Sequence, residues 1–117
     1  MRDGNALKER YLREDLPIRL GNLAFNVARI KSRCQNAANG EIIESLLQES
    51  KLLIEWTAQD AEIEIAAELV ELQIQLACWH YSWARVWEDA TQRMRVGEEG
   101  RIGSEKVLNM SGLFAVN

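Results

Sequence analysis

The chain has one proline, two cysteines and one histidine among its 117 residues. No glycine or proline occurs between residues 41 and 96, and an uninterrupted stretch of that kind is typical of helices. Two cysteines allow at most one disulfide bond, so a disulfide-stabilised secreted fold is not indicated. We expect both cysteines to be reduced residues of a cytoplasmic protein.

Long apolar runs are also missing. No segment approaches the roughly 18 consecutive apolar residues of a membrane span, and the polar start MRDGNALKERYLRED does not have the pattern of a secretory signal. We therefore expect no membrane contact. With 47% hydrophobic and 27% charged residues, the chain has the composition of a globular protein, and its length predicts a single domain over residues 1–117.

Apolar residues recur at alternating spacings of four and three from residue 16 onward, which is the pattern of an amphipathic helix. Asp15 and Pro17 suit the cap and the first turn of a helix, so a first helix is predicted over about residues 16–38, ended by Asn39 and Gly40. A second helix is predicted over 41–57. We expect a break near residues 57–60, because one helix over 41–96 would be about 84 Å long.

The third predicted helix, about residues 60–96, is apolar on two faces. Its first seam continues the regular spacing: Ile65, Leu69, Leu72, Leu76, Trp79, Trp83, Val86 and Ala90. Its second face holds Ile63, Ala66, Ala67, Val70, Ile74, Ala77 and Tyr81. A helix that is apolar on two sides is normally covered on both. The first two helices can cover one, so the other requires the C-terminal tail or a second chain.

These elements predict an all-α fold, an antiparallel bundle of three main helices. Three glycines between residues 97 and 103 indicate a loop. We therefore expect residues 97–117 to be partly flexible, with a short C-terminal helix from about Ser104. Residues 1–13 are expected to be partly flexible as well.

The segment ACWHYSWARVW, residues 77–87, concentrates the aromatic residues. Trp79 and Trp83 continue the first seam, and His80 and Trp87 flank it. The third helix would be about 55 Å long against about 34 Å for the first, so its aromatic end would project beyond the first hairpin and need cover. We predict that Trp79, His80, Trp83 and Trp87 bind a partner, and that the protein is a non-catalytic interaction or assembly protein without a cofactor. We expect it to self-associate as a dimer through the second apolar face or the aromatic half of the third helix.

Paired carboxylates favour a second interpretation. Glu41 and Glu44 form one Glu-x-x-Glu pair, and Glu68 and Glu71 form another. Two such pairs on antiparallel helices could hold Mg²⁺ through oxygen ligands, and helices that meet near residue 58 would bring Glu44 and Glu71 to nearly the same height.

This arrangement resembles the MazG-type nucleotide pyrophosphohydrolases, an all-α family whose motif is Glu-x-x-Glu followed by Glu-x-x-Asp. Glu71 stands where that family has aspartate, which leaves the last ligand of the motif in doubt. The resemblance implies Mg²⁺-dependent cleavage of a nucleoside triphosphate into its monophosphate and pyrophosphate.

The distribution of charge leaves a third interpretation open. Residues 1–38 carry eight Lys and Arg against four Asp and Glu, whereas residues 39–75 carry one against nine. The basic segment can pack beside the acidic one. Alternatively, Arg29, Lys31 and Arg33 can contact nucleic acid, with bases stacked on the tryptophans near Arg85, Arg93 and Arg95. The net charge of −4 favours packing within the chain over a nucleic-acid partner.

Overall fold

The computed structural model describes residues 4–112, and every regular element in that range is helical. The elements are α1 (Gly4–Leu12), α2 (Leu16–Arg33), the short 3₁₀ turn η1 (Ala37–Asn39), α3 (Gly40–Ala58), α4 (Ile63–Tyr81), α5 (Trp83–Glu88) and α6 (Ala90–Ser111). The predicted all-α class is confirmed. The predicted number of main helices is wrong, because four long helices form the bundle.

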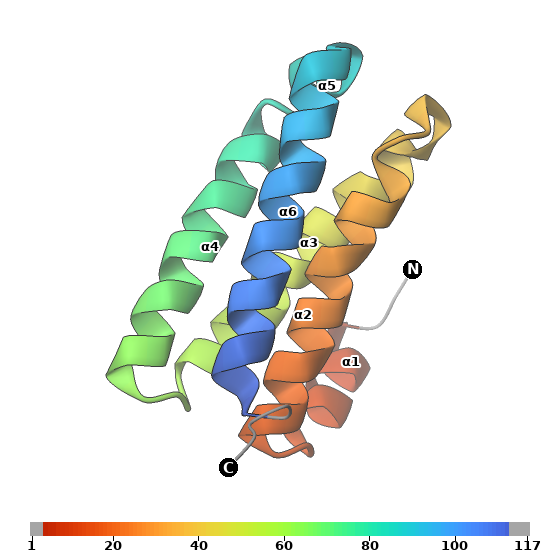
Figure 1. Cartoon of the computed structure of the whole chain (residues 1–117). Helices are drawn as coiled ribbons and strands as arrows, with labels where there is room; N and C mark the ends of the chain where they lie inside the picture. Colours follow the sequence, from red (N-terminus) through yellow and green to blue (C-terminus); the bar gives the residue numbers. More distant parts are fainter. Residues whose placement is uncertain (1–3, 113–117) are drawn as a thin grey trace.

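The four long helices run alternately up and down, with α1 and α5 at opposite ends of the bundle (Figure 1). Helix α2 packs most extensively against α6, and α3 packs against both α2 and α4. Helix α4 lies at the edge and has few contacts with α6. The result is a flat molecule of 40 × 37 × 20 Å in which α4 depends mainly on α3 for its packing. Within residues 4–112, no helix combines the length and the apolar character needed to cross a membrane.

The apolar seams fill the core, as their spacing predicts. Leu23, Val27 and Ile30 of α2 are completely buried, and so are Ile43, Leu47 and Ile54 of α3 and Leu69 and Leu76 of α4. The predicted break between the second and third helices is confirmed, since α3 ends at Ala58 and α4 begins at Ile63. Pro17 occupies the first turn of α2, also as predicted.

The expectation that residues 97–117 form a loop with a short helix is wrong for the part the structure describes, because α6 continues to Ser111. Gly97, Gly100 and Gly103 recur every third residue and share one face of α6. A Cβ atom at Gly97 would lie 3.3 Å from Cys34 Cβ, and one at Gly100 would lie 3.6 Å from Ile30 Cγ2. Gly97 and Gly100 therefore allow α6 to approach α2 closely, whereas a Cβ atom at Gly103 would lie 3.1 Å from Leu72 Cδ1 of α4. This close packing offsets the low helix propensity of the glycines. The last residues of the sequence, 113–117, lie outside the described range.

The prediction of one helix over 60–96 is also wrong. The chain leaves the helical path at Ser82 and again at Asp89, so the predicted third helix is divided among α4, α5 and the start of α6. Asp89 caps α6, because its carboxylate accepts hydrogen bonds from the backbone N–H groups of Thr91 (2.9 Å) and Gln92 (3.3 Å). Aspartate is a favoured N-cap residue, so Asp89 is a local signal that could have indicated this helix start.

Two further boundaries differ from the prediction. Helix α2 ends at Arg33 rather than Ala38, and Gly40 begins α3 with a right-handed φ of −53° instead of ending the first helix in a left-handed conformation. At the N-terminus, residues 4–12 form helix α1, which the sequence pattern did not indicate. Tyr11 anchors this helix, because its hydroxyl donates to the carbonyl of Arg19 (2.8 Å) and lies 2.6 Å from the Thr57 hydroxyl.

Candidate interaction surface

The tryptophans Trp83 and Trp87 form a cap over the end of the α2–α3 hairpin. Their rings stack with centroids 5.2 Å apart. Trp83 Nε1 donates to the carbonyl of Gly40 (3.2 Å), and Trp87 Nε1 donates to that of Ala37 (2.8 Å). Both indole N–H groups therefore have hydrogen-bond acceptors within the chain. The projecting aromatic end predicted from the sequence is absent from the described residues, because α5 folds back over the hairpin.

Arg93 holds this cap from the other side. Its guanidinium carbon lies 5.4 Å from the centroid of the Trp87 ring, and its Nη1 donates to the Trp87 carbonyl at 2.6 Å. A cation over the face of an indole is attracted by the negative face of the ring. The cap is therefore closed by contacts within the chain.

The remaining predicted partner-binding residues lie on α4. Trp79 is partly buried and packs against the core. His80 is half-buried, with Nδ1 2.9 Å from Lys51 Nζ and Nε2 3.3 Å from a Glu44 carboxylate oxygen. Because an ammonium group can only donate, His80 Nδ1 accepts from Lys51, and the Nε2 side of the ring lies against the Glu44 carboxylate. This polar bridge ties α4 to α3.

The structure does not bring the two glutamate pairs together. Gly40 contacts Trp83, Glu44 contacts His80 and Lys51 contacts Gln73, so the α3–α4 hairpin is centred near Glu62 and not near residue 58. Glu44 therefore lies across from His80. Glu68 and Glu71 instead line a separate cavity of about 380 Å³ between α4 and α6. From residue 4 to residue 112, no group of three or more His, Cys, Asp or Glu side chains could hold a metal ion.

The cavity between α4 and α6 has an apolar floor that includes Leu72, Val107 and Met110. Gln75 on α4 donates to the Glu99 carboxylate on α6 across 3.0 Å, and Arg95 also reaches that carboxylate at 3.3 Å. Between α4 and α6, the hydrogen bond from Gln75 to Glu99 and the cavity thus replace the apolar side-chain contacts of a more tightly packed bundle. Helix α4 is consequently the least supported of the four long helices.

The basic residues proposed for nucleic acid are partly paired within the chain. Lys31 lies 3.7 Å from Glu98, and Arg95 lies 3.3 Å from Glu99. The basic segment 1–38 and the acidic segment 39–75 also meet. Arg19 on α2 donates a hydrogen bond of 2.9 Å to Asp60, which follows α3.

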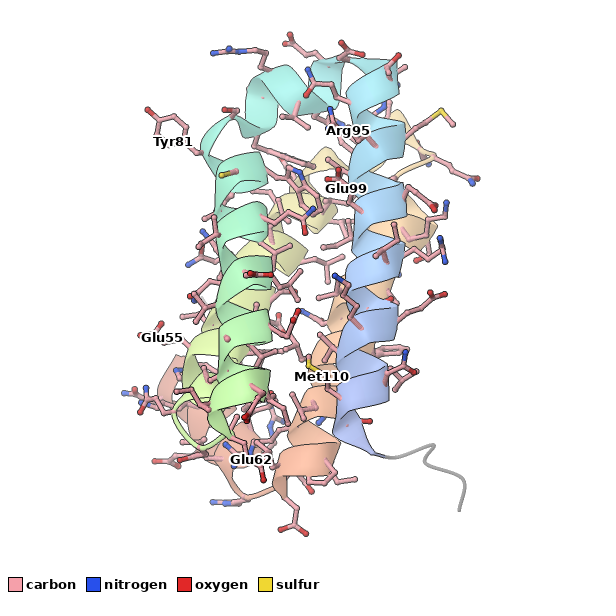
Figure 2. The ribbon with its side chains drawn as sticks, turned by 60° about the vertical axis from the view of Figure 1, so that its left-hand side comes forward. Glu55, Glu62, Tyr81, Arg95, Glu99 and Met110 are labelled. Atoms are coloured by element: carbon pink, nitrogen blue, oxygen red, sulfur yellow. The ribbon has the colours of Figure 1, made fainter. Side chains whose placement is uncertain are left out.

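The second apolar face of α4 remains exposed. We define the outer α4 stripe as six residues with alternating spacings of four and three: Ile63, Ala67, Val70, Ile74, Ala77 and Tyr81. The exposed fractions of its large side chains are 80% for Ile63, 44% for Val70, 59% for Ile74 and 94% for Tyr81. Figure 2 shows Tyr81 directed away from the bundle on the side opposite α6. Ala66, expected on the same face, is partly buried.

Comparison with known proteins found no matching family model, no matching curated sequence and no matching solved structure.

Proposed function

We propose that this protein is a small, cytoplasmic, non-catalytic interaction or assembly protein that self-associates through the outer α4 stripe. The carrying observation is the exposure of four large apolar side chains in register on one helix face. The opposite face of the same helix already fills the core through Leu69, Leu72 and Leu76. The outer α4 stripe therefore takes no part in the core of the single chain.

Exposed apolar residues elsewhere have a different distribution. Phe25 on α2 and Met94 on α6 are 68% and 75% exposed, and the other large apolar residues that the structure describes outside α4 are at most 42% exposed. Phe25 and Ile18 line a groove with Leu108 of α6, and Met94 does not line that groove. Scattered exposed apolar residues are normal on soluble proteins. A continuous apolar stripe the length of a helix is typical of a protein–protein contact.

This proposal moves the interface away from the tryptophans. Trp83 and Trp87 hydrogen-bond within the chain, whereas His80 borders the stripe in a shallow pocket with Lys51, Ala77 and Tyr81. Of the four partner-binding residues predicted from the sequence, His80 is the one that we place at the edge of the interface. A cytoplasmic location is consistent with the unpaired thiols of Cys34 and Cys78.

The alternatives lack an observation of comparable weight. The Mg²⁺-dependent hydrolase requires four carboxylates around one site, whereas Glu44 lies beside His80 and Glu68 and Glu71 line the separate α4–α6 cavity. The nucleic-acid interpretation requires available cations, and Lys31 is paired with Glu98 while Arg93 packs on Trp87.

The direct test compares two double variants with the wild type by light scattering over a range of protein concentrations. Val70→Gln/Ile74→Gln makes the centre of the stripe polar while keeping helix-compatible side chains. We expect a dimeric wild type and a monomeric variant with unchanged helical circular dichroism. Phe25→Gln/Met94→Gln removes equally exposed apolar residues outside the stripe and should remain dimeric. A wild type that is monomeric at high micromolar concentration would contradict the proposal.

A further inference from the structure

The outer α4 stripe has the same pattern of side-chain size when it is read in either direction. Leu72 is its midpoint: Val70 and Ile74 lie two positions away, Ala67 and Ala77 five, and Ile63 and Tyr81 nine. From either end the order is large, small, large, large, small, large. Two copies placed antiparallel about this midpoint would pair Ile63 with Tyr81, Ala67 with Ala77 and Val70 with Ile74.

In this pairing, the two side chains that meet in each layer of the contact are both large or both small. The two small layers, each an alanine against an alanine, let the helix axes approach, and the large layers fill the space on either side. A parallel pair in register would also match sizes, because each residue would meet its own copy, but it would set Tyr81 against Tyr81 at one end. The order of sizes therefore permits the antiparallel pair, and the charges of α4 distinguish the two orientations.

The charges of α4 favour the same orientation. Glu62, Glu64, Glu68 and Glu71 all lie in the N-terminal half or just before it, and no acidic residue occurs from Leu72 to Val86. Parallel helices would align the four carboxylates of one copy with those of the other. Antiparallel helices place the carboxylates of one copy beside the C-terminal half of α4 in the other copy, which carries His80 and is followed by Arg85. The antiparallel orientation also sets the two helix dipoles in opposite directions. Glu71, near the midpoint, is the one acid that would face its own copy.

We infer that α4 pairs with α4 of a second copy of this chain in an antiparallel orientation, about a two-fold axis beside Leu72. This inference rests on the self-association proposed above, and it adds the orientation and the register.

The available area is sufficient for such a dimer. The stripe runs from Ile63 to Tyr81, which is 19 residues and about 27 Å along the helix. With areas of about 150–250 Å² for large side chains, the four large residues expose about 500 Å² per copy. A standard interface buries about 800 Å² per partner. The alanines, Cys78 and the polar residues along both edges of the stripe supply the remainder.

Native Cys78 provides a reporter of orientation, because it is exposed beside the stripe. In the antiparallel pair, position 64 of one copy lies next to Cys78 of the other. Within one chain these positions are about 21 Å apart along the helix, which is too far for a disulfide. A Glu64→Cys variant under mild oxidation should therefore form a covalent dimer. The same variant with Cys78→Ser should not, and neither should the wild type, since the two Cys78 residues would lie about 18 Å apart.

A second variant tests the opposite orientation. In Tyr81→Cys/Cys78→Ser, the two introduced thiols would be adjacent in a parallel pair and about 27 Å apart in the antiparallel one. We expect no covalent dimer from it while light scattering still detects non-covalent association. A dimer that is crosslinked through position 81 and not between positions 64 and 78 overturns the orientation and leaves self-association intact. A dimer that neither variant crosslinks overturns the register. A monomeric wild type overturns the proposed function itself.

Discussion

At the scale of the residue, burial controls the chemistry of Cys34. Its side chain is 5% exposed at the end of α2 and faces Gly97 of α6. Burial raises the pKa of this thiol to about 11, because the thiolate loses its hydration, and the nearby charges of Lys31 and Arg93 offset only part of this effect. Cys34 therefore behaves as a core residue and not as a reactive thiol.

This raised pKa predicts an alkaline loss of stability. The thiol of the unfolded chain ionises near 9.0, well below the folded value of about 11, so its contribution is complete below pH 9 and is lost as the pH rises toward 11. The free energy of unfolding, measured by urea denaturation, should fall more steeply over this range in the wild type than in Cys34→Ala. Cys78→Ser, which removes an exposed thiol, is the matched control and should keep the wild-type slope. Equal slopes for the wild type and Cys34→Ala would contradict the assignment.

At the scale of the element, glycines have opposite roles in α6 and α3. A Cβ atom at Gly100 would meet Ile30 Cγ2 and the Val27 carbonyl at ordinary contact distances of 3.6 Å. A Cβ atom at Gly40 would lie only 2.8 Å from Trp87 Nε1 and would displace the indole from its bond to Ala37. Helix propensity alone would favour alanine at both positions.

We therefore expect the two alanine variants to differ in sign. Gly100→Ala should raise the free energy of unfolding by about 0.5–1 kcal/mol, because alanine loses less backbone entropy on folding. Gly40→Ala should lower it by about 1 kcal/mol through the lost indole hydrogen bond. Urea denaturation measures both changes, and tryptophan fluorescence should shift only in Gly40→Ala. A destabilised Gly100→Ala would mean that α2 and α6 are too close for any side chain there.

The same elements explain how far the sequence predicts this structure. Alternating spacings of four and three identified the buried faces of α2, α3 and α4, because those helices bury one regular seam each. The three glycines of α6 misled the prediction, because they serve close packing against other helices: Gly97 and Gly100 against α2, over 60 positions earlier in the chain, and Gly103 against Leu72 of α4. The turn at Ser82 is likewise fixed by hydrogen bonds to Ala37 and Gly40. Local patterns carry no information about such distant partners.

The candidate site was predicted only in part. The second apolar face of α4 was correctly separated from the core seam, since helical spacing alone distinguishes two faces. The partner-binding residues were placed in the aromatic segment because a straight third helix would have carried it beyond the hairpin. Because α5 folds back, the indole N–H groups of Trp83 and Trp87 donate to backbone carbonyls within the chain. The exposed apolar surface is instead the outer α4 stripe.

At the scale of the whole molecule, α4 is the edge of a flat bundle and has few contacts with α6. Those contacts include Leu72 against Gly103 and the hydrogen bond between Gln75 and Glu99, beside the cavity. A second copy placed on the outer α4 stripe would support this edge helix from outside. Self-association and folding stability are then thermodynamically linked, because a partner that binds only the folded chain stabilises it.

This linkage predicts that thermal stability depends on protein concentration. For one binding site, a free-partner concentration one hundred times the dissociation constant adds about 2.7 kcal/mol, a large share of the 5–15 kcal/mol typical of a domain. The midpoint of thermal unfolding should therefore rise between low and high micromolar wild-type protein. The gain should disappear in Val70→Gln/Ile74→Gln and persist in Phe25→Gln/Met94→Gln. Hydrogen exchange locates the effect: backbone amides of α4 should gain protection with concentration in the wild type. If protection rose instead only in α2 and α6, the chains would associate through another face.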